Sequence, residues 1–149
     1  MDAEIPSDKN MRDLIAFLAL VGVVVSGLAL RVHYDTGTEP CSINAHWDCG
    51  VVNHSSYAEV AHVPVAILGI LGYLALGGLG FYRQRYLFLL VAIVGLAFAL
   101  RLSLIEELVL GVWCLYCVIS QGIIVLMVLL GLGWFSWEYW TLRQQAKAQ

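Results

Sequence analysis

The sequence predicts an all-α integral membrane protein whose helices form a four-helix bundle. Of its 149 residues, 60% are hydrophobic and 13% are charged, and the mean hydropathy is +0.80. A water-soluble fold of this size would expose too much apolar surface. The apolar residues also occur in unbroken runs close to the length that crosses about 30 Å of hydrocarbon. The chain has no basic patch suited to nucleic acid and no phosphate-binding glycine loop. We therefore expect a multi-pass membrane protein without a nucleic-acid partner.

Four apolar runs are long enough to be membrane spans: residues 14–30, 63–81, 86–104 and 108–134. We expect residues 1–149 to form a single membrane domain, with a short connection near residues 105–107. No small-residue cleavage site closes the first run, so we expect this helix to be retained. Residues 31–62 are polar and rich in turn-forming residues, and we expect them to form a long outer loop.

The basic residues set the predicted orientation. On one side of the four-span arrangement lie Lys9, Arg12, Arg83, Arg85, Arg143 and Lys147, whereas Arg31 and Arg101 lie near the other side. Cytoplasmic segments carry an excess of Lys and Arg, so we expect both termini in the cytoplasm. All four cysteines then fall on or near the outer side. In a bacterial inner membrane that side faces the oxidising periplasm.

Cys114 and Cys117 form a Cys-x-x-Cys pair at the predicted start of the last span. Because a helix turns once in about 3.6 residues, the two cysteines share a face at a spacing that a disulfide can bridge. Unpaired backbone N–H groups and the helix dipole in the first turns favour a thiolate. The pair is therefore a candidate redox centre. The alternative is two buried cysteines that pack as small hydrophobic residues.

Cys41 and Cys49 form a second pair in the predicted outer loop. A mobile loop lets one of these thiols reach a neighbouring disulfide, as thiol–disulfide exchange requires. One alternative is a static disulfide that staples the loop. Another is a metal site, because His46 and His54 complete the pattern Cys-x4-His-x2-Cys-x4-His. That spacing matches no common zinc pattern, and we expect no metal.

The order of these features resembles the vitamin K epoxide reductase family, and more narrowly its bacterial members that oxidise protein thiols. The resemblance covers about residues 14–130. It rests on the loop cysteine pair, Ser55-Ser56-Tyr57, the run from Pro64 to Tyr73 and the late Cys114-x-x-Cys117. DsbB-type thiol oxidases perform similar chemistry on four helices, but their Cys-x-x-Cys lies in the first outer loop. The order found here disfavours that type.

The resemblance implies a membrane thiol oxidoreductase that supports disulfide bond formation. A separate thioredoxin-fold, DsbA-like protein would reduce the Cys41–Cys49 disulfide. The loop dithiol would then reduce Cys114–Cys117, through a transient bond between Cys49 and Cys114. Cys117 lies deeper and would deliver the electrons to a quinone of the ubiquinone, menaquinone or vitamin K type.

The quinone is expected between the second and fourth spans, near Ser55, Val65, Leu68 and Gln121. Ser55 either bonds the loop or a quinone oxygen, or caps the helix that follows. Vertebrate members of the family hold the vitamin K ring with an asparagine and a tyrosine, whose places are taken here by Val65 and Gln121. These departures argue against epoxide reduction but not against quinone reduction.

Two further expectations concern partners and rival functions. Many bacterial members carry a fused thioredoxin-like domain, whereas this chain stops shortly after its last span, so we expect the thiol partner to be a separate protein. The alternatives are a vitamin K quinone or epoxide reductase that uses the same cysteines, and a non-enzymatic scaffold with structural disulfides. A transporter is disfavoured because no charged residue lies deep in any predicted span.

Overall fold

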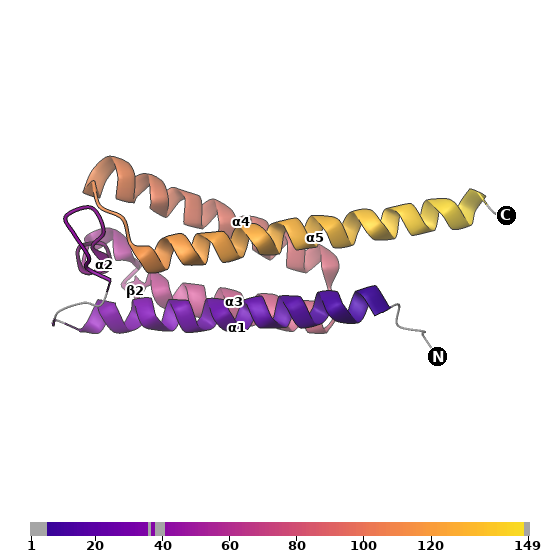
Figure 1. Cartoon of the computed structure of the whole chain (residues 1–149), viewed down its shortest axis with the longest axis horizontal. Helices are drawn as coiled ribbons and strands as arrows, with labels where there is room; N and C mark the ends of the chain where they lie inside the picture. Colours follow the sequence, from indigo (N-terminus) through magenta and orange to yellow (C-terminus); the bar gives the residue numbers. More distant parts are fainter. Residues whose placement is uncertain (1–5, 36, 38–40, 148–149) are drawn as a thin grey trace.

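The structure is a computed structural model, and it describes residues 6–35, 37 and 41–147. The elements in order are α1 (Pro6–Tyr34), α2 (Cys49–Asn53), the 3₁₀ helix η1 (Ser56–Ala58), β1 (Glu59–Val60), β2 (Val63–Pro64), α3 (Val65–Phe81), α4 (Arg85–Ile105), the π-helical turn η2 (Glu106–Leu110) and α5 (Leu115–Lys147). Four long helices form the body, and the short elements between α1 and α3 gather at one end (Figure 1).

Three helical segments among the described residues are long and apolar enough to cross a membrane: Lys9–Tyr34, Arg85–Leu110 and Leu115–Thr141. The fourth long helix, α3, is also apolar but has only 17 residues. The predicted helical class is therefore confirmed, with several helices suited to a membrane. The two-residue strands of the β1–β2 hairpin are an addition that we did not predict.

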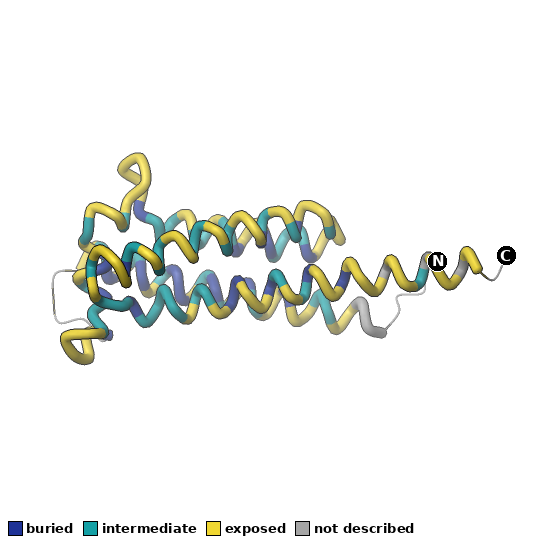
Figure 2. Tube along the Cα trace, turned by 90° about the horizontal axis from the view of Figure 1, so that it is seen from above, coloured by how far each residue is buried: buried dark blue, intermediate teal, exposed yellow. Residues whose placement is uncertain are grey.

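The four long helices pack around a shared interior. α1 contacts α3 and α5, and α4 contacts the same two helices from the other side. Phe88 and Met127 are fully buried at the centre of the core. Residues on the outside of the helices are largely exposed (Figure 2), and many of them are apolar, as at Leu90 and Leu129. A continuous apolar exterior of this kind suits contact with lipid.

Tyr73 joins three of these helices. A Cβ atom at Gly22 of α1 would lie 2.5 Å from the Tyr73 ring, so glycine is required for α1 and α3 to approach this closely. From α3, the Tyr73 hydroxyl donates a hydrogen bond of 2.7 Å to the Ser120 carbonyl of α5. Because a tyrosine hydroxyl needs a partner when its ring is buried, this bond fixes the ring between the helices.

The first and last helices differ in their bounds from the predicted spans. α1 continues to Tyr34, and the last helix begins at Leu115 rather than near residue 108. Residues 108–110 instead extend α4 through η2, which ends where Gly111 adopts a φ of 66°. Glycine is favoured in this left-handed conformation. Hydrophobicity did not reveal the break, because residues 108–110 are as apolar as the helix that follows.

Much of the predicted outer loop has regular structure. Residues 49–64 form α2, η1 and the β1–β2 hairpin, in which Glu59 pairs with Pro64 and Val60 with Val63. The hairpin turns at Ala61 and His62, whose φ angles are 51° and 65°. Positive φ at both turn residues matches the right-handed twist of a two-residue hairpin. These elements form a compact cap at the end of the helices opposite the start of α1 and the end of α5 (Figure 1).

Candidate active site

Cys41 and Cys49 form a disulfide within the cap, with a Cα–Cα distance of 5.8 Å. Both residues are buried, and they belong to a cluster that also contains Val32, Val52 and Cys114. The loop pair is therefore packed directly against the first cysteine of the Cys-x-x-Cys pair. The structure brings together the four cysteines singled out in the sequence, since Cys117 packs against the same cluster.

Two backbone hydrogen bonds hold the loop in this position. The Asp48 N–H donates to the Trp113 carbonyl at 3.1 Å, and the Trp113 N–H donates to the His46 carbonyl at 2.9 Å. Together they form a parallel bridge between Trp47 and Trp113. Because Asp48 and Trp113 immediately precede Cys49 and Cys114, the bridge sets the two cysteines side by side.

Asp48 also begins the short helix that carries Cys49. Its carboxylate caps α2 by accepting the Val51 N–H at 3.2 Å, and it accepts the Ser42 hydroxyl at 2.8 Å. The hydrogen bond from Ser42, followed by that from Val51, lowers the pKa of Asp48 below its ordinary value. The charged form of Asp48 thus ties the residue next to Cys41 to the helix that begins at Cys49.

Cys114 and Cys117 are free thiols in this structure. Cys114 is fully buried and directly precedes α5, whereas Cys117 lies in the first turn of α5 and is partly buried. The Cys117 N–H donates to the Cys114 sulfur at 3.4 Å. We expected both cysteines within the first helical turns, and the later start of α5 moves Cys114 to the position that precedes the helix.

Hydrogen bonds favour the thiolate form of Cys114. The bond from the Cys117 thiol lowers the pKa of the Cys114 thiol below its ordinary value, and the Cys117 backbone N–H acts in the same direction. The Asn53 side-chain amide, 3.5 Å from the sulfur, contributes as well. Burial and the nearby Glu106 charge oppose these bonds without outweighing them. Cys114 is thus set up as the thiolate of the pair.

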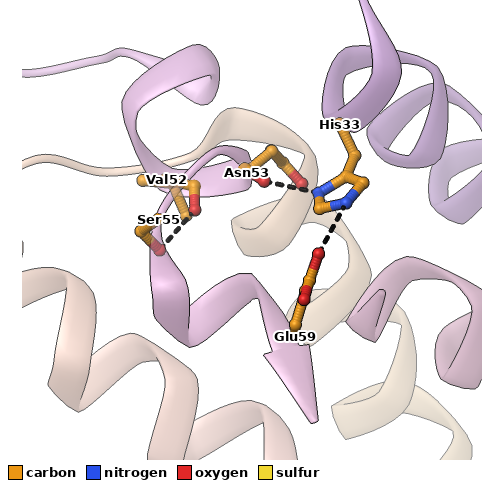
Figure 3. A network of polar contacts seen from close by, with 5 residues as sticks. All are labelled: His33, Val52, Asn53, Ser55 and Glu59. Carbon is orange, nitrogen blue, oxygen red and sulfur yellow. Dashed lines mark hydrogen bonds and ion pairs between the residues drawn. The ribbon is translucent and has the colours of Figure 1, made fainter. Parts of the chain in front are cut away.

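Asn53 is held in turn by a polar network that links the cap to α1 (Figure 3). Its side-chain amide donates to the Cys49 carbonyl at 2.9 Å, and its backbone carbonyl lies 2.6 Å from His33 Nδ1. The other ring nitrogen of His33 lies 3.4 Å from the Glu59 carboxylate. The network therefore fixes the amide that contacts Cys114 from both the helix and the hairpin.

A cavity of about 360 Å³ opens beside Cys117, between the four long helices and the cap. This volume lies within the range of small-molecule sites. Most of its wall is apolar, with polar groups at a few positions: Ser26, Asn53, Ser55, Tyr57, Tyr73, Ser103, Glu106, Tyr116 and Ser120. Cys117 lines the cavity, whereas Cys114 belongs to the buried cluster under the loop disulfide. Cys114 thus faces the loop disulfide, whereas Cys117 faces the cavity.

The residues predicted to surround a quinone lie as follows. Ser55, Val65 and Leu68 line the cavity. The Ser55 hydroxyl donates to the Val52 carbonyl at 2.7 Å, so it bonds the loop (Figure 3). It does not cap the second span, because α3 begins at Val65 and its N-cap residue is Pro64. Gln121 is not part of the cavity wall. Its side-chain oxygen accepts a hydrogen bond from the hydroxyl of Ser103, and Ser103 does line the cavity.

Two residues of the site escaped the sequence analysis, namely Asn53 and Glu106. Both residues are polar and buried, and both contact Cys114. The Asn53 side-chain amide donates to the Cys114 sulfur, and the Glu106 carboxylate accepts the Cys114 backbone N–H at 3.1 Å. Glu106 was predicted in an outer connection, but it begins η2 and lies inside the segment Arg85–Leu110. Glu106 lies four residues before the end of that segment, so the expectation that no charged residue lies deep in a predicted span stays a prediction. An acidic residue between two apolar runs was the available signal.

The histidines of the outer loop do not gather around the cysteines. His46 contributes its backbone to the bridge with Trp113, and the His54 ring stacks on His33 at a centroid distance of 6.5 Å. Across the described residues, no group of three or more His, Cys, Asp or Glu side chains is arranged to hold a metal ion. The disulfide leaves neither loop cysteine free as a thiolate ligand.

Comparison with known proteins agrees with the arrangement of the cysteines. The model of the vitamin K epoxide reductase family matches residues 14–132. This range includes the loop disulfide, the Cys-x-x-Cys pair and the residues that line the cavity beside Cys117. The search of curated proteins found no match at the threshold used. The chain belongs to the vitamin K epoxide reductase family and is a membrane oxidoreductase.

Proposed function

We propose that this protein is a quinone-dependent protein-thiol oxidoreductase that supports disulfide bond formation. The observation that carries the proposal is the division of the Cys-x-x-Cys pair, because Cys114 packs against the loop disulfide while Cys117 lines the cavity. A carrier that receives electrons on one side and delivers them on the other needs this arrangement. A purely structural pair would gain nothing from it.

The first steps are two thiol–disulfide exchanges. A thioredoxin-fold, DsbA-like partner gives two electrons and two protons to the Cys41–Cys49 disulfide and leaves oxidised. Cys49 then attacks Cys114 of the oxidised lower pair, so that a Cys49–Cys114 bond forms and Cys117 leaves as a thiolate. Cys41 attacks Cys49, which restores the loop disulfide and releases Cys114.

The last step reduces the quinone. The reduced Cys114–Cys117 pair supplies two electrons to one quinone, which takes up two protons and becomes a hydroquinone while the Cys114–Cys117 disulfide forms. The cavity is the proposed site of this substrate, with Ser55, Val65 and Leu68 in its wall. Its volume and apolar lining suit a ring. Gln121 would act on the quinone only indirectly, by accepting a hydrogen bond from the Ser103 hydroxyl.

The proposed setting is the bacterial inner membrane, with α1, α3, α4 and α5 as a spanning bundle. α3 has 17 residues and is therefore about 26 Å long, close to the thickness of the hydrocarbon core. The start of α1 and the end of α5 lie at the same end of the helices, opposite the cap (Figure 1). Together with the excess of basic residues near those ends, this supports cytoplasmic termini and a periplasmic disulfide.

The test is anaerobic electron transfer by purified protein in lipid. A reduced DsbA-type protein is the donor, a short-chain ubiquinone or menaquinone is the acceptor, and both thiols and hydroquinone are measured. We expect stoichiometric transfer by the wild type and none by Cys114→Ala or Cys117→Ala. Ile119→Ala is a matched control, because this exposed residue lies on the same helix. Wild-type rates in either cysteine variant would refute the proposal, and loss of folding in both would indicate a structural staple.

A further inference from the structure

Glu106 is a buried carboxylate at the site. Only 2% of the residue is exposed, and within the described part of the chain no other acidic or basic residue is buried. Its Oε2 atom accepts the Cys114 N–H at 3.1 Å. Burying a carboxylate is costly unless hydrogen bonds compensate, and a neutral side chain could accept the same N–H. The need of the Cys114 N–H for an acceptor therefore does not explain why residue 106 is a glutamate and not a neutral residue.

The carboxylate also reaches the thiol that faces the cavity. The Cys117 thiol lies near enough to Glu106 to interact with it, and both residues line the cavity. Glu106 thus lies where a quinone beside Cys117 would be within its reach. Besides Glu106 and Cys117, the titratable side chains in the cavity wall are the tyrosines Tyr57, Tyr73 and Tyr116.

The local backbone accounts for this placement. Glu106 is the first residue of η2, a π-helical turn, and such turns are frequent at functional sites. Gly111 then reverses the chain with a φ of 66°, and the segment returns so that Cys114 lies next to Glu106. The two residues are eight positions apart in sequence, yet they are in contact.

Reduction of a quinone by this pair requires a proton to move. Cys114 is the cysteine set up as the thiolate, so the Cys117 thiol must lose its proton when its sulfur attacks the quinone. The Cys117 thiol faces a largely apolar cavity, which offers few groups that could take this proton. A carboxylate that lies beside the thiol in the wall of the same cavity can accept it.

We propose that Glu106 is a catalytic proton carrier, which takes the proton from the Cys117 thiol and gives it to a quinone oxygen. This inference rests on the proposed function. The Cys117 sulfur bonds to the quinone as its S–H bond breaks, and Glu106 passes the proton to the oxygen. The Cys114 thiolate then attacks the Cys117 sulfur. The disulfide forms, the bond between sulfur and quinone breaks, and the electron pair leaves with the hydroquinone anion, which takes its second proton from water.

The test compares Glu106→Gln with Glu107→Gln in the same lipid assay. Glutamine keeps an oxygen for the Cys114 N–H but cannot accept a proton, whereas Glu107 is an exposed neighbour. We measure two half-reactions separately: reduction of the Cys114–Cys117 disulfide by the thiol partner, and oxidation of the dithiol by short-chain ubiquinone. General base catalysis contributes about 10² to 10⁴ in rate, so Glu106→Gln should slow the second half-reaction at least about 100-fold. The first half-reaction should change less than about threefold.

The pH dependence separates proton transfer from positioning. Without Glu106 the Cys117 thiolate forms only by exchange with solvent. The rate of the Gln variant should then rise about tenfold per pH unit below the thiol pKa, more steeply than the wild type. If Glu106→Gln does not fold, Glu106→Ala with added formate replaces it, and formate should restore at least tenfold of the lost rate, as expected for replacement of the missing base.

The outcomes distinguish the two proposals. If the wild type does not reduce quinone, the proposed function fails. If the wild type does so and Glu106→Gln matches Glu107→Gln in rate and pH profile, Glu106 carries no proton and the inference is overturned. Equal slowing of both half-reactions, or no rescue by formate in the Ala variant, would also overturn it, since either result would assign Glu106 a structural role.

Discussion

Filling the cavity from Gly72 should block quinone binding without disturbing the fold. Gly72 lines the cavity, and a Cβ atom added there would meet no other atom within 4 Å. A leucine side chain takes up on the order of 100 Å³, roughly a third of the 360 Å³ cavity. Because a helical glycine costs about 0.5–1 kcal/mol relative to alanine, Gly72→Leu should not lower the free energy of unfolding.

The same helix provides the control. Gly78 also has open space at its Cβ position, but it does not line the cavity. In the quinone reduction assay, Gly72→Leu should raise the KM for quinone at least about tenfold, equivalent to about 1.4 kcal/mol of lost binding, while Gly78→Leu keeps the wild-type value. Reduction of the Cys114–Cys117 disulfide by the thiol partner should be unchanged in both variants. An unaltered KM in a folded Gly72→Leu protein would refute the assignment of the cavity.

Three further predictions concern the cap and the choice of acceptor. The pKa of Asp48 is lowered in the folded state by Ser42, so the stability it adds is present above about pH 4 and is lost as the pH falls through the folded pKa. Reduction of the loop disulfide by a water-soluble phosphine, measured relative to a small reference disulfide at each pH, should accelerate over that range, and Asp48→Ala should abolish the acceleration. Asn53→Ala removes a hydrogen bond to the Cys114 sulfur that contributes about 1 kcal/mol. The variant should therefore have an about fivefold smaller thiolate population at Cys114 and reduce quinone more slowly by a similar factor at neutral pH. An unchanged rate would count against the assignment of Cys114 as the thiolate. Vitamin K epoxide should remain unreduced in product analysis, because Val65 of the cavity wall cannot donate a hydrogen bond to it, and conversion by the wild type would disprove this.

Hydropathy and cysteine spacing were sufficient for the membrane-type helical class and for the family, since both depend on patterns along the chain. They were not sufficient for the start of the last helix. Residues 108–110 are as apolar as α5, and the break depends on the backbone conformation of Gly111. The status of the loop pair was also left open between a shuttle, a static disulfide and a metal site. Its pairing became clear from the position of Cys41 beside Cys49.

The polar part of the site depends on contacts between residues that are distant in sequence. Asn53 contacts the Cys114 sulfur although the two residues are 61 positions apart in the sequence, and the local sequence of neither residue predicts this contact. The bridge from Trp47 to Trp113, which brings the two cysteine pairs together, is equally invisible to periodicity. Glu106 was assigned to an outer connection because charged residues usually mark the end of a span, whereas the hydrogen bond from the Cys114 N–H, just before α5, helps to offset the cost of its burial.

The relay from the loop to the lower pair is tested most directly in the Cys41→Ser variant. Once Cys49 has attacked Cys114, this variant has no neighbouring loop thiol to resolve the mixed disulfide. Peptide mapping under non-reducing conditions should then find a Cys49–Cys114 cross-link, as the packing of these two residues in one buried cluster leads us to expect. If Cys49 instead remains a free thiol under oxidising conditions while Cys114 is bonded only to Cys117, electrons do not pass between the two pairs in this way.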